Sequence, residues 1–221
     1  MANTKIDAIV FDLGGVLIEM VSGWEHAHRL ANLREISINS LPANFHQKRK
    51  LLADDHQRGA IDLRTWSSEI SNASESIYTP ENAVDILKTW IIKEFEGVEK
   101  IIEHLKSIGI PTMGFSNTNT FHWDLLGIKD NNFSSFPVLE LLDEIHGSHQ
   151  IKQIKPNYES FQAFEEITNL SKKKILFFDN EIENIASARQ YGWYARHIHV
   201  NKEPADQIKA SLIQHRILSR A

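Results

Sequence analysis

The sequence of 221 residues contains no cysteine. Disulfide bonds, thiolate metal sites and cysteine nucleophiles are therefore excluded. Hydrophobic runs are short, and the run from Ala8 to Phe11 is far below the roughly 20 residues that a membrane-spanning helix requires. The N-terminal residues also lack the basic, apolar and small-residue order of a secretory signal. We therefore expect a cytoplasmic protein with no membrane partner.

Positive charge is scarce, since 24 lysine and arginine residues stand against 29 aspartate and glutamate residues, for a formal net charge of -5. A weakly acidic protein offers no electrostatic basis for binding nucleic acid. The composition, with 42% hydrophobic and 24% charged residues, is ordinary for a soluble globular protein. The length suits one α/β domain with a modest insertion.

One short apolar segment typical of a buried strand lies near the N-terminus, and after Gly97 further such segments alternate with helical segments. The predicted strands are Ile6–Phe11, Ile110–Phe115, Lys174–Phe178 and Tyr194–Val200. The predicted helices are Val98–Ser107, Tyr158–Thr168, Ile182–Tyr191 and a C-terminal segment that includes Ile208 and Ile217. This alternation predicts a parallel sheet with crossover helices.

The segment from about Trp24 to Glu96 has a different pattern. Its apolar residues recur at helical spacing, it contains few strand candidates, and Pro42, Gly59 and Pro80 interrupt it. We predict three or four helices that form a small separate bundle. The amphipathic tail after Pro204 is expected to dock either on its own core or on a neighbouring copy, so the oligomeric state is left open.

Polar residues follow three of the predicted strands, at the point where each strand ends. Asp12 follows the first strand, Ser116 the second and Asp179 the third. In open parallel sheets, ligands bind at the carboxyl ends of the strands. The sequence therefore predicts that these distant residues meet in a single site.

Four short motifs occur in a fixed order: Asp12-Leu13-Gly14-Gly15-Val16, Ser116-Asn117-Thr118-Asn119, Lys155-Pro156, and Asp179-Asn180 followed by Asn184. Over nearly the whole chain, this set resembles the four motifs of the haloacid dehalogenase (HAD) superfamily. Within that superfamily, the sequence is similar to small sugar-phosphate phosphatases of the α-D-glucose-1-phosphate phosphatase type. Those enzymes share the first two motifs and a turn like His56-Gln57-Arg58-Gly59.

The resemblance implies an α/β fold with a Rossmann-like parallel-sheet core over residues 1–20 and 97–221 and helices on both faces of the sheet. It also implies that residues 21–96 form a small inserted α-helical cap. Where the cap and the core face each other, residues near the substrate are expected. They are Trp24, His56, Arg58 and His122.

The resemblance further implies phosphoryl transfer, for which these residue types are suited. A carboxylate at Asp12 can attack phosphorus and form an aspartyl-phosphate, which splits one hard displacement into two easier ones. The carboxylate and the phosphate repel each other, so a cation must lie between them, and Mg²⁺ suits oxygen ligands. The implied metal ligands are Asp12, Asp179, Asn180 and the backbone carbonyl of Gly14.

Lys155, Ser116 and Asn117 are the implied phosphate-binding residues. Lys155 supplies a positive charge to the phosphoryl oxygens and to the transition state. The Ser116 hydroxyl and the loop amides after it offer hydrogen bonds to a phosphoryl oxygen. The implied catalytic residues are therefore Asp12, Lys155 and Asp179.

Three positions depart from the motifs. Gly14 stands where the common motif has an acid that assists the leaving oxygen, an effect worth roughly 10²–10⁴ in rate. The similar sugar phosphatases also lack this acid, and a good leaving group such as a sugar 1-phosphate needs it less. Asn180 replaces the usual metal-binding acid, so we predict weak Mg²⁺ binding. Lys152 stands where the family commonly has glycine.

Three functions follow as alternatives. The first is a Mg²⁺-dependent phosphatase that acts on a small phosphorylated metabolite. The second is a metal-independent 2-haloacid dehalogenase, in which Asp12 attacks carbon. The missing acids at Gly14 and Asn180 fit it, but the first motif lacks the aromatic-Gly-Thr continuation of those enzymes. The third, motivated by Asn180, is a catalytically degenerate domain that binds a ligand or a protein partner.

Overall fold

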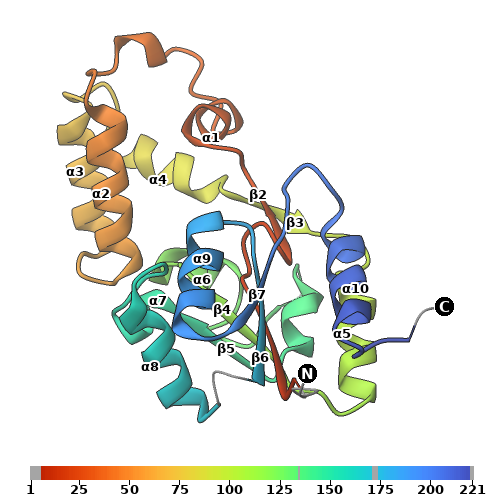
Figure 1. The fold of residues 1–221 in the computed structure, drawn as a ribbon. Coiled ribbons are helices and arrows are strands. Elements are labelled where there is room, and N and C mark those ends of the chain that lie inside the picture. Colours follow the sequence, from red (N-terminus) through yellow and green to blue (C-terminus); the bar gives the residue numbers. More distant parts are fainter. Residues whose placement is uncertain (1–5, 134, 171–173, 220–221) are drawn as a thin grey trace.

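The computed structural model describes residues 6–133, 135–170 and 174–219 (Figure 1). A parallel sheet with helices on both faces forms the core, and a second group of helices lies above one end of the sheet. Among the described helices, none combines the length and the apolar character needed to cross a bilayer. The first five residues, on which the expected lack of a secretory signal rests, lie outside the described residues.

The core sheet has five strands in the order β5-β4-β1-β6-β7, and all neighbouring strands are parallel. Their bounds are β1 Ala8–Phe11, β4 Thr112–Ser116, β5 Glu144–Gly147, β6 Ile175–Asp179 and β7 Tyr194–His197. From the central β1, the chain moves outward through β4 to β5 and then returns to build β6 and β7 on the other side. Ligands bind beside such a reversal point in open parallel sheets. The predicted Rossmann-like α/β class is confirmed.

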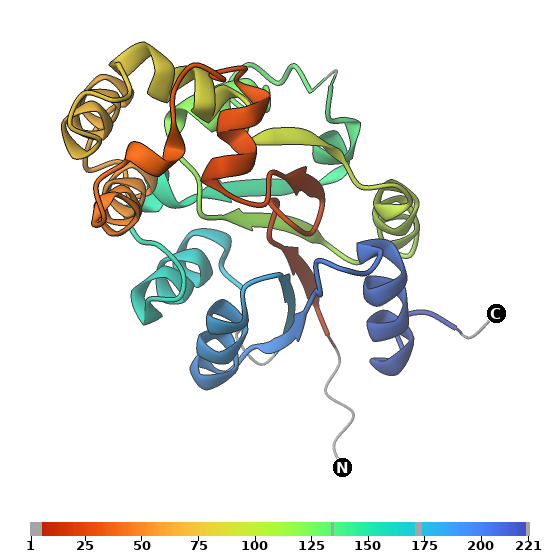
Figure 2. The same cartoon turned by 90° about the horizontal axis from the view of Figure 1, so that it is seen from above.

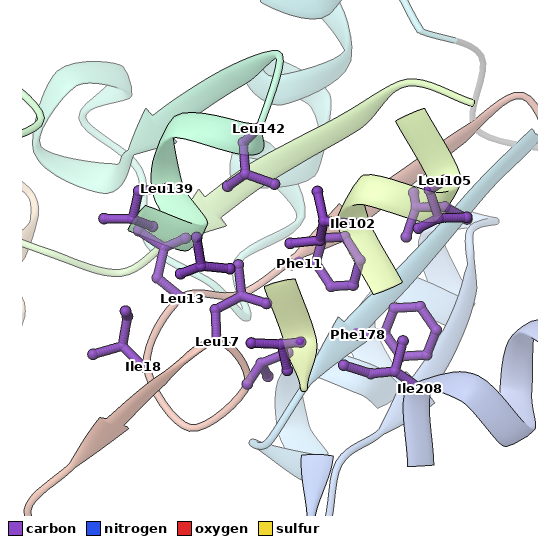
Figure 3. Packing of buried hydrophobic residues seen from close by; sticks show 14 of the residues in the cluster. Phe11, Leu13, Leu17, Ile18, Ile102, Leu105, Leu139, Leu142, Phe178 and Ile208 are labelled. Atoms are coloured by element: carbon purple, nitrogen blue, oxygen red, sulfur yellow. The ribbon is translucent and has the colours of Figure 1, made fainter. Parts of the chain in front are cut away.

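Alternate residues of β1 point to opposite faces of the sheet. Ile9 and Phe11 belong to the cluster on one face, where the sheet packs against α5 (Val98–Ser107), α10 (Pro204–Gln214) and the 3₁₀ helix η2 (Pro137–Leu141). Figure 3 shows this packing, in which the ring of Phe11 stacks on Phe178 with centroids 5.5 Å apart. The C-terminal helix α10 thus docks on the core of its own chain.

The opposite face of the sheet is mainly aromatic. It is covered by α8 (Tyr158–Thr168) and α9 (Ile182–Tyr191), while the short α7 (Ser148–Ile151) follows β5. Its buried residues include Val10, Phe115, Phe161, Phe164, Phe177 and Trp193. Because both faces are buried, the strands are apolar along their length, as is usual for parallel sheets. Figure 2 shows the helices on the two sides of the sheet.

Four α-helices, the cap helices, lie between Trp24 and Lys88. They are α1 Trp24–Leu30, α2 Phe45–Gln57, α3 Leu63–Ala73 and α4 Pro80–Lys88, with a short 3₁₀ helix η1 at Ile38–Ser40. They pack around a separate hydrophobic cluster that includes Trp24, Phe45, Ile70, Tyr78 and Ile86. Local signals fix some ends: Asp62 accepts a bond from the Thr65 amide, and Thr79 forms a capping box with Asn82.

An antiparallel ribbon connects the cap helices to the core. It consists of β2 (Ile18–Met20) and β3 (Ile91–Glu94). The sequence pattern did not reveal β3, because this strand is short and only partly buried and directly follows the apolar spacing of α4. The predicted last strand ends early at His197, and the core strand β5 is absent from the prediction.

Candidate active site

Asp12 lies directly after β1, at the carboxyl end of the central strand. Its Oδ1 accepts a hydrogen bond from the Leu13 amide at 2.8 Å and lies 3.2 Å from Nζ of Lys155. Among the residues that the structure describes, Oδ2 of Asp12 accepts no hydrogen bond. One carboxylate oxygen is therefore held in place while the other is available to an incoming group.

Lys155 is a fully buried cation behind Asp12. Its Nζ donates to the carbonyl oxygen of Phe115 at 2.7 Å and to Oδ2 of Asp179 at 2.8 Å. Together with the Asp12 contact, these bonds use the three protons of the ammonium group. The Nζ atom also lies 5.0 Å from the ring centroids of both Phe115 and Phe177. Lys155 is thus positioned by the protein alone.

The carboxylate of Asp179 is surrounded by N–H donors. Oδ1 accepts from the Glu181 amide at 2.8 Å and from Nδ2 of Asn184 at 3.1 Å. Oδ2 accepts from the same Nδ2 at 3.0 Å and from Lys155 at 2.8 Å. Asp179 therefore fixes Lys155. Its predicted role as a metal ligand would require it to exchange one of these contacts, and that role stays a prediction.

The charges of these three groups are coupled. Burial raises the pKa of Asp12 to about 7, with the Lys155 charge opposing this rise and the Asp179 charge adding to it. Burial alone would lower the pKa of Lys155, but the adjacent carboxylates of Asp12 and Asp179 outweigh it, so the net shift is upward. Lys155 therefore carries its charge at neutral pH. A second cation beside Asp12 would lower the pKa of that carboxyl and favour its ionised form.

A pocket of about 740 Å³ opens above Asp12, between the end of the sheet and the cap helices. Of the predicted catalytic, phosphate-binding and metal-binding residues, five line it: Asp12, Gly14, Ser116, Asn117 and Asn180. Lys155 and Asp179 are absent from the residues that line the pocket and lie behind Asp12. The predicted contact of Lys155 with a phosphate therefore stays a prediction.

Asn117 ties the loop after β4 to the segment that carries Lys155. Its Nδ2 donates to the Lys155 carbonyl oxygen at 2.8 Å, and its Oδ1 accepts from the Lys155 amide at 2.9 Å. Both ends of the Asn117 side chain are thus engaged with the main chain of Lys155. Any phosphate contact made by Asn117 would involve its backbone.

Ser148, which the sequence patterns did not indicate, connects the same loop to the cap helices. Its hydroxyl accepts from the Thr118 amide at 2.9 Å and lies 2.7 Å from the Gln57 carbonyl oxygen. Gln57 is the last residue of α2. No short motif marks Ser148. Its role as a link between the loop and the cap helices can be recognised only from the way the cap approaches the core.

Three of the four residues predicted to lie near the substrate line the pocket, namely Trp24, His56 and His122. The fourth, Arg58, lies outside the pocket lining and pairs with Asp55 on the surface of the cap. Arg49, which lies within α2, lines the pocket instead, whereas Arg58 directly follows the end of that helix.

The oxygen donors of the pocket suit Mg²⁺ better than a transition metal. Asp12, Gly14, Asn180 and Glu181 all line the pocket, and Nδ2 of Asn180 donates to Oε1 of Glu181. The described residues include no group of three or more histidine, aspartate or glutamate side chains placed to hold a metal. Mg²⁺ is usually bound by one or two carboxylates, with waters and substrate phosphate completing its shell. The oxygen donors of the pocket fit that pattern, since few of them are charged.

A family model described as haloacid dehalogenase-like hydrolase matches residues 6–192. The chain belongs to the haloacid dehalogenase-like hydrolases. The described site therefore belongs to a hydrolase of this family. It comprises the reversal point of the sheet, Asp12 at the strand end and the buried Lys155.

Solved structures of HAD enzymes share the fold. A predicted HAD-like hydrolase from Porphyromonas gingivalis has a TM-score of 0.75 and 23% identity, over 94% of this chain and 98% of that one. A HAD-family enzyme from Bacteroides thetaiotaomicron, in complex with magnesium and inorganic phosphate, has a TM-score of 0.71 and 19% identity, over 89% and 96%. The L-2-haloacid dehalogenase from Xanthobacter autotrophicus, with chloropropionic acid covalently bound, has a TM-score of 0.60 and 14% identity, over 96% and 84%.

Proposed function

We propose that this HAD hydrolase is a Mg²⁺-dependent phosphatase that acts on a small phosphorylated metabolite through an aspartyl-phosphate on Asp12. The observation that carries this proposal is the state of the Asp12 carboxylate. Lys155 and the Leu13 amide fix one oxygen. The other has no partner among the described residues and lies at a pocket large enough for a metabolite.

The reaction has two displacements at phosphorus. In the first, the free oxygen of Asp12 forms a bond to phosphorus while the bond from phosphorus to the alcohol oxygen breaks. Because Gly14 provides no acid, the departing alkoxide takes its proton from water. In the second, water attacks the phosphorus and the bond to Asp12 breaks. Inorganic phosphate leaves as dihydrogen phosphate, which keeps both protons of the water, and the carboxylate is restored. Lys155 keeps Asp12 oriented throughout and supplies fixed positive charge behind it.

Asp12, Asn180 and the Gly14 carbonyl are the residues that would hold Mg²⁺, with Asp179 and Glu181 close by. The ion supplies charge neutralisation between the carboxylate and the phosphate. The neutral amide of Asn180 replaces a charged ligand, so the affinity for the ion is weak without substrate. The magnesium and phosphate bound to the Bacteroides enzyme of the same fold support this choice of ion.

The absence of an acid at position 14 bears on the substrate. A leaving group of low pKa needs less help from an acid, and the anomeric oxygen of a sugar 1-phosphate is a better leaving group than an ordinary alcohol oxygen. We therefore place sugar 1-phosphates first among the candidate substrates, in keeping with the similarity of the motifs to sugar-phosphate phosphatases.

The test is phosphate release from p-nitrophenyl phosphate and a sugar-phosphate panel, with excess Mg²⁺ and with chelator. We expect turnover only with Mg²⁺, and none from the Asp12→Asn variant after circular dichroism has shown it to be folded. No phosphate release from any ester by folded wild-type protein overturns the proposal. Halide release from 2-chloropropionate in chelator would instead identify a dehalogenase. Thermal stabilisation by esters without turnover would identify a ligand-binding domain.

A further inference from the structure

Arg49 is an unneutralised cation in the wall of the pocket. It is the only lysine or arginine among the described residues that line the pocket, and it forms no ion pair in the described part of the chain. Its Cζ lies 5.3 Å from the ring centroid of Trp24. Burial lowers the pKa of the guanidinium, and no carboxylate opposes that shift. A guanidinium stays charged even so.

Helix α2 presents one face to the pocket. Arg49, Ala53 and His56, which line the pocket, follow the spacing i, i+4 and i+7 that places residues on one side of a helix. Gln57, at the end of the same helix, contacts Ser148 of the core. Arg49 is therefore about 12 Å along the axis from the point where the cap meets the core, at 1.5 Å per residue.

The same wall contains donors without acceptors. Nε of Arg49 and Nε1 of Trp66 are both buried without a hydrogen-bond partner among the described residues. Trp66 is stacked on His56, with ring centroids 5.5 Å apart. Burial lowers the pKa of His56 to about 4, so the imidazole is neutral at pH 7. A buried donor that lacks a partner is costly, and a buried charge more so.

We propose that Arg49 binds a second anionic group of the substrate, either a carboxylate or a second phosphate, on the cap side of the pocket. This inference rests on the proposed phosphatase function, because the first anionic group is the phosphate at Asp12. The anionic group of the ligand would pair with Arg49, which has no carboxylate partner among the described residues. His56, which also lines the pocket, offers a further hydrogen bond to a polar group of the same ligand. The substrate class is thus phosphate monoesters with an additional acidic group.

Three esters with the same ring and the same leaving oxygen test the proposal. They are glucose 1-phosphate, glucuronic acid 1-phosphate and glucose 1,6-bisphosphate. Hydrogen bonds between charged groups contribute about 10- to 150-fold in affinity, so we expect at least a tenfold higher kcat/KM for one acidic ester than for glucose 1-phosphate. Preference for the glucuronic acid ester identifies a carboxylate site, and preference for release of the 1-phosphate from the bisphosphate identifies a phosphate site. No preference for either overturns the proposal.

Variants assign the preference to Arg49. Arg49→Gln should remove the preference for the acidic ester. The loss of kcat/KM should be at least tenfold larger for that ester than for glucose 1-phosphate. Arg49→Lys, which keeps the charge without the two-pronged geometry, should retain part of it. Lys50→Gln, at an exposed neighbour outside the pocket lining, is the matched control and should leave the preference unchanged. An equal loss on all three esters in Arg49→Gln would contradict a specific role.

A binding measurement separates this inference from the phosphatase function. Titration calorimetry of Asp12→Asn with the same esters and Mg²⁺ reports affinity without turnover. If wild-type protein hydrolyses nothing but Asp12→Asn binds an acidic ester at least tenfold more tightly than glucose 1-phosphate, the phosphatase proposal fails while the Arg49 site stands. If the wild type hydrolyses esters and Asp12→Asn binds all three equally, only the Arg49 proposal fails.

Discussion

Asn117 and Lys155 are joined by two reciprocal hydrogen bonds of 2.8 and 2.9 Å between the side chain of the first and the main chain of the second. Lys155 in turn contacts Asp12, so the loop after β4 sets the position of the proposed nucleophile from a distance. In the proposed mechanism Asn117 is therefore a positioning residue, and it acts on the Asp12 carboxylate through the segment that carries Lys155.

Asn117→Ala should lower kcat on the order of 10- to 100-fold, because small displacements of reacting groups have effects of that size. KM should change less, since both ends of the Asn117 side chain are engaged with the main chain of Lys155. The measurement is steady-state phosphate release, with Asn72→Ala on the exposed surface of the cap as the control. A proportional rise in KM with constant kcat would contradict a positioning role.

Lys155→Met should destabilise the fold by about 3–5 kcal/mol, because it leaves the carboxylates of Asp12 and Asp179 buried without their cation. Urea unfolding gives the change in free energy. The control is Lys174→Met, which removes the exposed ion pair with Asp7 and should cost at most about 1 kcal/mol. Equal losses of unfolding free energy in the two variants would show that burial of Lys155 with its two carboxylates does not affect stability.

Asn180→Asp should tighten Mg²⁺ binding by about tenfold, since affinity for the ion rises with the charge of its ligands. Nδ2 of Asn180 donates to Oε1 of Glu181 at 2.9 Å. Without metal, the new carboxylate would therefore face Glu181, and we expect a lower melting temperature that Mg²⁺ restores. Titration calorimetry and thermal unfolding without substrate measure both effects. Asn72→Asp controls for net charge, and unchanged affinity in Asn180→Asp would argue against an ion at this wall.

The stability of the cap should depend on pH through His56. Burial is the main cause that lowers its pKa from 6.5 to about 4, and the charge of His122 adds to the effect. Between pH 6.5 and 4 the unfolded chain binds the proton and the folded protein does not. The stability linked to His56 is therefore complete above pH 6.5 and is lost as the pH falls toward 4.

Urea unfolding at pH 7 and pH 4.5 tests this linkage. His56→Gln should lose less stability between the two values than the wild type. His122 and His149 shift in the same direction, so a part of the loss should persist in the variant. An equal loss in the two proteins would show that His56 does not carry the effect.

Local patterns were sufficient for much of the core. The bounds of Val98–Ser107, Tyr158–Thr168 and Ile182–Tyr191 agree with the prediction, because periodic apolar residues and helix-ending signals lie within each segment. The edge strand Glu144–Gly147 could not be recognised in this way. It is partly exposed, has no apolar alternation of its own and is defined by its pairing with β4.

The sequence was sufficient to predict that polar residues at the strand ends lie together. It was not sufficient to predict which of two nearby residues lines the pocket, because that depends on packing. Arg49 and Arg58 lie on or next to the same helix, and only the docking of α2 decides which one lines the pocket. The four N–H contacts of Asp179 likewise depend on where Asn184 and Lys155 arrive in space. Spacing in sequence does not encode these distances.

The antiparallel ribbon gives the two ends of the insertion a common anchor. Met20 and Ile91 are register partners in that ribbon, so the chain leaves and re-enters the core about 5 Å apart, one interstrand spacing. A tight hairpin turn could span that gap. The cap helices can therefore be exchanged, enlarged or trimmed during evolution while the residues around Asp12 keep their geometry.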